Sequence, residues 1–292
     1  MNDKSLIAID AHRIAALVEE QIPLLAQNLR PDYLAALETS LTTETSERSR
    51  AVLEQLVTNA HLAASDSLPL CQDTGYVWVC LEVCGPDLIP ADIFSGVNEA
   101  VERAYEASGL RMSILQDALL NRINTGNNCP AQCEILVLNH GDISRTNHSA
   151  ILHIMLKGGG SDNASALRML APNSGIEGVV DFVVQAVVEK GANACPPLVL
   201  GVGVGGSFDT VAGLAKHALL RPLGTSHPDD EIASLEKELL DRINSLDIGP
   251  GGLGGVTTAL GVHVESSPCH IASLPVAVNI SCTALRSISI PL

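Results

Sequence analysis

The spacing of apolar residues changes part-way along the chain, and this change limits the fold more than any other feature. From Ser5 to about Ala64, apolar side chains recur every three or four residues, as in helices. Residues Tyr76–Val83 form instead a dense run of β-branched, aromatic and other apolar residues, and helical and strand-like patterns alternate after it. The order predicts a mixed α+β fold, with a helical N-terminal segment followed by a β-sheet core flanked by helices.

Several later segments carry their own start or stop signals. A helical pattern begins near Pro90, a second one stops at Gly191, and a third opens with the acidic residues 229–231, which favour a helix N-terminus. Residues 133–141 and 149–157 are strand-like and are joined by a polar turn, which predicts a hairpin. No repeat or linker is visible, so we expect one domain over residues 1–292, with residues 1–64 as its helical segment.

Composition excludes several classes of function. The chain has 33 acidic against 17 basic residues, and aromatic residues make up 2% of it. Nucleic-acid binding normally uses clustered Lys and Arg and stacking aromatic rings, so we expect no nucleic-acid partner. The most apolar stretch, Pro196 to Val204, is far shorter than the ~20 residues that span a bilayer, and the N-terminus is unlike a signal peptide. We therefore expect a cytoplasmic protein without a membrane partner.

Two glycine-rich turns are candidate binding loops. Gly201, Gly203 and Gly206 match the G-x-G-x-x-G pattern of dinucleotide sites, but the acidic residue expected after the next strand is missing. Close packing of a strand against a helix is the better interpretation of these three glycines. The second run, residues 157–163, contains three consecutive glycines whose backbone N–H groups can converge on an anion. It can equally be a flexible turn.

Three of the eight cysteines lie at the edges of regular elements. Cys71 is in the polar loop 71–75, Cys195 follows a helix, and Cys282 follows a strand. Three separated thiolates can hold an iron–sulfur cluster with one iron left open, or they can be ordinary core cysteines. The pairs Cys80–Cys84 and Cys129–Cys133 are expected to be small buried apolar residues.

Two further side chains are candidates for binding or catalysis. Arg111 follows a helix, and its guanidinium can bind a carboxylate through two parallel hydrogen bonds. His270 stands before the strand that leads to Cys282, which places it close in sequence to a candidate ligand. Each can also be structural, as a surface charge or as a buried histidine.

These motifs together resemble the alpha-type part of the iron–sulfur hydro-lyases of the class I fumarate hydratase and L-tartrate dehydratase family. The resemblance spans nearly the whole chain in the right order. The matching segments are Cys71–Gly75, Lys157–Asn163, Asn193–Pro197, Leu220–Gly224, Asp247–Pro250 and His270–Arg286.

The resemblance implies a 4Fe–4S cluster held by Cys71, Cys195 and Cys282, with the fourth iron open to substrate. A Lewis-acidic iron makes hydroxide a better leaving group, which suits the dehydration of a 2-hydroxy acid. By carry-over, Gln72, Asp73 and Arg111 and the backbone of Gly159 and Gly160 bind the substrate carboxylates. Asp73 and His270 are the implied catalytic residues for proton transfer.

In this family the remaining active-site residues belong to a beta-type domain or subunit. We therefore expect a partner beta subunit and an αβ or (αβ)₂ assembly. The implied activity is the reversible dehydration of (S)-malate to fumarate, an assignment that the form of residues 157–163 favours. L-tartrate dehydratase and mesaconate hydratase are the alternatives. A nucleotide-binding oxidoreductase and a catalytically inactive scaffold subunit are the hypotheses from other classes.

Overall fold

The computed structural model describes residues 9–83, 89–138 and 150–292, and in it the chain forms two compact units. Unit 1 comprises residues 1–28, 67–157 and 286–292, and unit 2 comprises residues 29–66 and 158–285. Both units are assembled from separate stretches of the chain. No helix among the described residues is long and apolar enough to cross a membrane.

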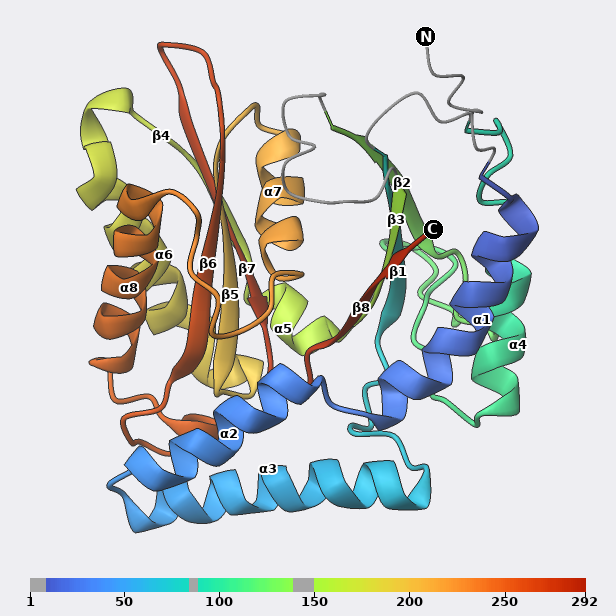
Figure 1. Ribbon diagram of the computed structural model, residues 1–292, viewed down its shortest axis with the longest axis horizontal. Coiled ribbons are helices and arrows are strands. Elements are labelled where there is room, and N and C mark those ends of the chain that lie inside the picture. The colour runs from blue at the N-terminus through green and yellow to red at the C-terminus, as the bar shows by residue number, and fades with distance from the viewer. Residues whose placement is uncertain (1–8, 84–88, 139–149) are drawn as a thin grey trace, which may run out of the picture. The chain divides into compact units, whose positions relative to one another are not determined.

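Unit 1 is built on a four-stranded sheet with the strand order β2-β1-β3-β8 (Figure 1). Strand β1 is parallel to β2 and antiparallel to β3, and β3 is antiparallel to β8. The elements of this unit are β1 (Tyr76–Val83), β2 (Gln132–Val137), β3 (Ala150–Lys157), β8 (Arg286–Pro291), α1 (Ala11–Gln27) and α4 (Val97–Ala107).

Alternate side chains of β1 form part of the hydrophobic core of unit 1. Val77, Val79 and Leu81 point to one face of the sheet because successive strand side chains point to opposite faces. There they join the buried stripes of α1 and α4, represented by Ile14 and Val101, which are not exposed at all. The opposite face carries polar side chains as well as apolar ones.

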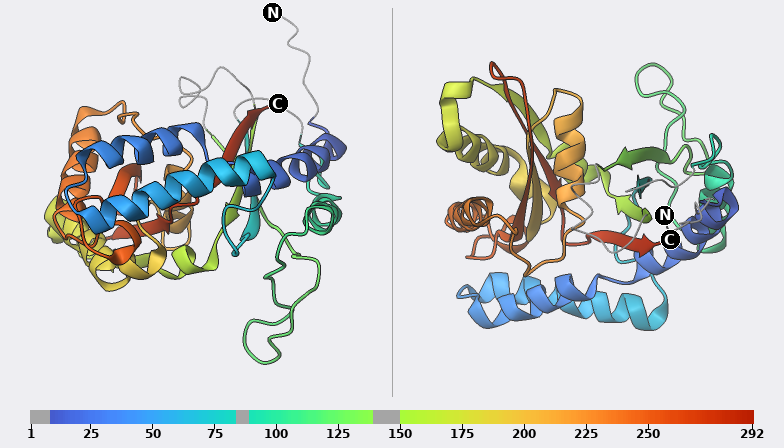
Figure 2. Two further views of the ribbon diagram at one scale, coloured as in Figure 1. Left: turned by 90° about the horizontal axis from the view of Figure 1, so that it is seen from below. Right: turned by 45° about the horizontal axis from the view of Figure 1, so that its top comes forward.

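Unit 2 contains a second four-stranded sheet with the order β4-β7-β5-β6. Helices α6 and α8 pack on one face of this sheet and α7 packs on the other, while α2 and α3 run side by side (Figures 1 and 2). The strands are β4 (Ala166–Leu170), β5 (Leu198–Gly205), β6 (Ala259–Ser267) and β7 (Leu274–Ser281). The helices are α2 (Pro31–Thr43), α3 (Glu47–Asp66), α5 (Gly159–Asn163), α6 (Gly175–Lys190), α7 (Thr210–Ala218) and α8 (Asp230–Asn244). Three 3₁₀ turns complete it: η2 (Pro172–Ser174), η3 (Gly191–Ala194) and η4 (Pro250–Gly252).

The glycines of β5 are where the sheet of unit 2 meets α7. A Cβ atom at Gly201 would lie 2.0 Å from the carbonyl oxygen of Ala215, and one at Gly203 would lie 2.4 Å from that of Val211. No side chain fits at either position because the helix backbone is already there. The G-x-G-x-x-G pattern is thus explained by close packing of a strand against a helix, as predicted.

The structure confirms the mixed α+β class and the early helices, but it differs from the sequence predictions in two places. The predicted hairpin is wrong: β2 and β3 do not pair with each other, because β1 lies between them. Helix α4 begins at Val97, several residues later than predicted. The chain divides into two compact units, with α1 in a different unit from α2 and α3, and the single domain over residues 1–292 stays a prediction.

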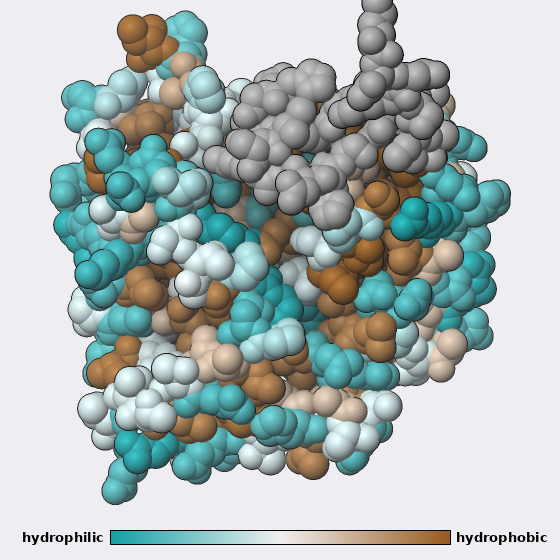
Figure 3. Space-filling model, viewed as in Figure 1, coloured by the Kyte–Doolittle hydropathy of each residue, from teal (hydrophilic) through white to brown (hydrophobic). Residues whose placement is uncertain are grey.

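The outer surface is mixed in character. On the face drawn in Figure 3, hydrophilic and apolar residues are interspersed over the described part of the chain. This pattern is ordinary for a folded protein surface, much of which apolar atoms normally contribute.

Candidate functional site

The loop that carries Cys71 leads directly into β1 in unit 1. The backbone N–H of Asp73 donates to the Cys71 sulfur at 3.4 Å, and the N–H of Gly75 donates to a carboxylate oxygen of Asp73 at 3.0 Å. Gly75 has a φ of +83°, and a Cβ there would lie 2.8 Å from the carbonyl oxygen of Lys157. Only glycine fits this position, so the loop has one well-defined path. The Cys71 side chain is half-buried.

Three buried side chains hold this loop by its carbonyl groups. The Tyr105 hydroxyl lies 3.1 Å from the carbonyl oxygen of Thr74 and 2.9 Å from that of Gly75, and burial raises the pKa of this phenol. The Asn128 amide donates to the same Gly75 oxygen at 3.2 Å. Arg286, which is 1% exposed, donates from Nη1 to the carbonyl oxygen of Asp73 at 2.8 Å.

Arg111 is attached to the same loop. The Thr74 hydroxyl donates to the Arg111 carbonyl oxygen at 2.6 Å, and the Arg111 side chain is exposed to solvent. Unit 1 therefore brings together four of the predicted residues, namely Cys71, Gln72, Asp73 and Arg111. The contact at Arg111 is made by its backbone carbonyl, and its exposed guanidinium is a group suited to binding a small polar anion.

Cys195 and Cys282 are brought together in unit 2. The N–H of Thr283 donates to the Cys195 carbonyl oxygen at 3.1 Å. The hydroxyl of the fully buried Tyr33 lies 2.9 Å from the Cys282 carbonyl oxygen and 3.2 Å from that of Pro197. Cys195 is exposed, and its φ of +55° is uncommon for a residue other than glycine. The two cysteine loops are thus joined by hydrogen bonds between their backbones and through a phenol.

The glycine-rich turn reaches the same part of unit 2. Gly159 and Gly160 begin α5, which packs against η3, just before Cys195, and against β7, just before Cys282. A Cβ at Gly160 would meet nothing within 4 Å, so this part of the turn faces open space. Unit 2 therefore gathers four more of the predicted residues: Gly159, Gly160, Cys195 and Cys282.

His270 is the predicted site residue that lies elsewhere in its unit. It sits in the turn between β6 and β7, whereas Cys282 follows the other end of β7. The eight residues of β7 separate the two by roughly 26 Å at the usual strand rise. His270 is exposed, and its Nδ1 accepts the N–H of Ala272 at 3.1 Å. Its position in this unit lends no support to a role beside Cys195 and Cys282.

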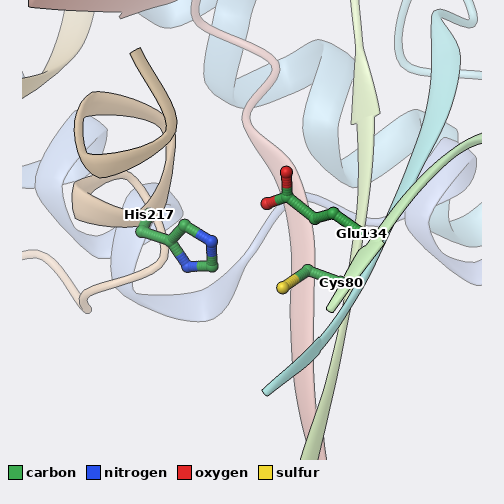
Figure 4. Close-up of side chains that lie close together, drawn as sticks. All are labelled: Cys80, Glu134 and His217. Carbon is green, nitrogen blue, oxygen red and sulfur yellow. The ribbon is translucent and has the colours of Figure 1, made fainter. Parts of the chain in front are cut away.

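The cysteines that were not predicted as ligands differ in how far they are buried. Cys80 is fully buried on β1 opposite Glu134 of β2, as Figure 4 shows, and burial together with Glu134 and Glu82 raises the pKa of its thiol. His217, also drawn there, belongs to α7 of unit 2. The prediction of burial is confirmed for Cys80 and Cys129 and is wrong for the exposed Cys133. Cys84 lies outside the described residues.

Sequence reasoning missed the side chains that hold the site loops in place. Tyr33, Tyr105 and Asn128 contact backbone oxygens of the predicted loops, but none of them belongs to a segment singled out in the sequence. Arg286 ends the matching segment His270–Arg286, but nothing in the sequence indicated its contact with the Asp73 carbonyl. One signal was available: the chain has only three tyrosines. A rare aromatic residue with a polar tip is a candidate for a specific buried hydrogen bond.

Comparison with known proteins identifies the class. The family described as fumarate hydratase (Fumerase) matches residues 15–291, and the chain therefore belongs to this family of hydro-lyases. It is 40% identical over 277 residues to "Putative L(+)-tartrate dehydratase subunit alpha" of Methanocaldococcus jannaschii, a match that covers 94% of this chain and 95% of that protein. It is 31% identical over 275 residues to L(+)-tartrate dehydratase subunit alpha of Escherichia coli K12, covering 94% of this chain and 89% of that protein.

Proposed function

We propose that the chain is the alpha subunit of an iron–sulfur-dependent hydro-lyase that reversibly dehydrates a small 2-hydroxy dicarboxylic acid. The observation that carries the proposal is that eight of the nine predicted site residues gather on two sets of loops, one in each unit. The names of the two relatives favour L-tartrate as the substrate. The form of residues 157–163 favours (S)-malate and fumarate, and mesaconate hydration is a further alternative of the same chemistry.

The chemistry of the donor set fits a 4Fe–4S cluster. Cys71 comes from unit 1, Cys195 and Cys282 come from unit 2, and none of the three is buried. The N–H group that Asp73 directs at the Cys71 sulfur is the type of hydrogen bond that stabilises a ligating thiolate. Three protein thiolates leave one iron of such a cluster open. When bound, the cluster supplies a Lewis acid that polarises the substrate hydroxyl.

The chain's own residues then bind and orient the substrate. The Arg111 guanidinium is suited to a bidentate contact with one substrate carboxylate, and the Gln72 amide can donate a hydrogen bond to it. The backbone N–H groups of Gly159 and Gly160 provide a second donor set for an anion. Asp73 is the proposed acid–base residue, because a carboxylate held beside the substrate can move a proton.

A beta-type partner subunit completes the proposal. Both relatives are alpha subunits by name, which favours a partner for this chain too. Leu119 and Leu120 expose 82% and 85% of their area, in the segment between Arg111 and Asn128 that begins at the proposed site. Large exposed apolar side chains of this kind are typical of protein–protein contacts.

Iron and sulfide quantitation after anaerobic purification tests the cluster. We expect about four irons per chain for the intact protein, a large loss in C71A, C195A and C282A, and no loss in the matched control C80A. Activity on L-tartrate, fumarate and mesaconate, with and without a co-expressed beta-type subunit, identifies the substrate and the need for the partner. The absence of iron after anaerobic reconstitution, or an equal loss in C80A, would contradict the proposal.

A further inference from the structure

A single buried hydroxyl group contacts both cysteine loops of unit 2. Tyr33 is on α2 and is completely buried. Its phenol oxygen is 2.9 Å from the carbonyl oxygen of Cys282 and 3.2 Å from the carbonyl oxygen of Pro197, which is two residues beyond Cys195. A phenol has one hydrogen to donate, so the two carbonyl groups share it.

The loop that this hydroxyl holds has an unfavourable backbone. Cys195 has a φ of +55°, a conformation that a residue other than glycine keeps only where the surrounding structure imposes it. Two hydrogen bonds hold it in this conformation: the Thr283 N–H donates to the Cys195 carbonyl oxygen, and the Tyr33 hydroxyl donates to that of Pro197. Removing either bond therefore allows the Cys195 backbone to relax and its thiol to turn.

A second buried tyrosine makes the equivalent contact in unit 1. The Tyr105 hydroxyl is 3.1 Å and 2.9 Å from the carbonyl oxygens of Thr74 and Gly75, in the loop that carries Cys71. Two of the three tyrosines in the chain thus have the same arrangement, one phenol on two carbonyl groups of a cysteine loop. Burial raises the pKa of both phenols, so both remain protonated donors around neutral pH.

We propose that Tyr33 is a positioning residue that fixes the directions of the Cys195 and Cys282 thiols, and that Tyr105 does the same for Cys71. What these thiols hold rests on the proposed function. The positioning itself is a property of the chain, and it can be measured without a cluster.

Thiol reactivity in the cluster-free chain tests the proposal. The substitutions Y33F and Y105F remove one oxygen atom each and keep the ring that fills the core. Alkylation by iodoacetamide, followed site by site by mass spectrometry, gives a separate rate for each cysteine. We expect Y33F to raise the rates of Cys195 and Cys282 about fivefold, the equivalent of one ordinary hydrogen bond, and to leave Cys71 unchanged. Y105F should show the reverse selectivity.

The control is D229A, which removes the N-cap of α8 in unit 2. The Asp229 side chain accepts the N–H groups of Glu231 and Ile232, so its loss weakens unit 2 without touching a cysteine loop. Selective changes in the two tyrosine variants, absent from D229A, would support the proposal. Unchanged rates in Y33F and Y105F, or a uniform rise like that of a merely destabilised variant, would overturn it.

Iron release to a chelator under anaerobic conditions is the second readout. We expect Y33F and Y105F to load iron and to lose it several-fold faster than the intact protein and D229A. If the intact protein binds no iron but the tyrosine variants still change alkylation selectively, the proposed function fails and the positioning role stands. If the intact protein holds iron and neither readout changes in the variants, the positioning role fails alone.

Discussion

Lowering the pH should destabilise unit 2 through one buried histidine. His263, on β6, is 3% exposed, and its Nδ1 lies 3.2 Å from the carbonyl oxygen of Ala218, so this nitrogen carries the proton of the neutral ring. Burial, reinforced by the charge of Arg221, lowers the pKa of His263 from 6.5 to about 4, although Glu236 nearby opposes the shift. The folded protein therefore holds this ring neutral at a pH where the unfolded chain protonates it.

The sign and size of the effect follow from proton linkage. Between pH 6.5 and pH 4 the unfolded state binds a proton at His263 that the folded state does not, so stability is lost as the pH falls through this window. For a pKa of 6.5 unfolded and about 4 folded, the contribution lost between pH 7.5 and pH 4.5 is about 2.5 kcal/mol.

Urea unfolding of the cluster-free chain at pH 7.5 and pH 4.5 measures this contribution. In H263N the asparagine amide can donate to Ala218 as Nδ1 does, but it does not titrate. The difference in unfolding free energy between the two proteins should change by about 2.5 kcal/mol between the two pH values, while carboxylates that titrate in both proteins cancel. The control is H61N, since the His61 side chain is 61% exposed. A difference that is the same at both pH values would refute the reasoning.

Two further predictions concern packing and the Cys71 loop. G203A should destabilise the protein by about 1–3 kcal/mol, because its Cβ would lie 2.4 Å from a carbonyl oxygen of α7. The control is G213A, within that helix, where a Cβ meets nothing within 4 Å; it should leave the melting temperature unchanged or raise it slightly. Equal melting temperatures for the two variants would contradict this explanation. R286Q should lower the free energy of unfolding by about 1.5–3 kcal/mol and speed anaerobic iron loss, because it removes a charged donor from the Asp73 carbonyl. R103Q, which changes an arginine on the surface, is its control. Equal iron retention in R286Q and R103Q would argue against a role for Arg286 in holding the loop.

Local sequence patterns predicted the strands that are most buried. β1, β5 and β7 are almost wholly buried, so each is a nearly continuous apolar run that is visible in the sequence. β4 and the outer part of β8 are half-exposed and mixed in polarity, and no pattern marked either of them. The pairing of β2 and β3 was mispredicted because the strand between them, β1, comes from earlier in the chain.

The residues of the candidate site also divide into those that local sequence patterns predicted and those that they did not. The predicted loops were recognisable because their chemistry is concentrated in a few consecutive residues, such as Cys71–Gly75. Tyr33 was not recognisable as part of the site, since the carbonyl groups that it contacts are 164 and 249 residues away in the sequence. His270 shows the limit of nearness in sequence: it is near Cys282 along the chain, but β7 lies between the two and carries them to opposite ends of the strand, so its proposed role stays a prediction.

The discontinuous make-up of the two units has a consequence for how the protein is made. β7 lies between β4 and β5 in the sheet of unit 2, and β8 pairs with β3 in unit 1, so neither sheet can close until residues 274–291 have left the ribosome. Until then, the nascent chain exposes the apolar strand edges that β7 and β8 cover in the folded protein. Such a chain depends on rapid closure, or on chaperones, to avoid aggregation before both sheets are complete.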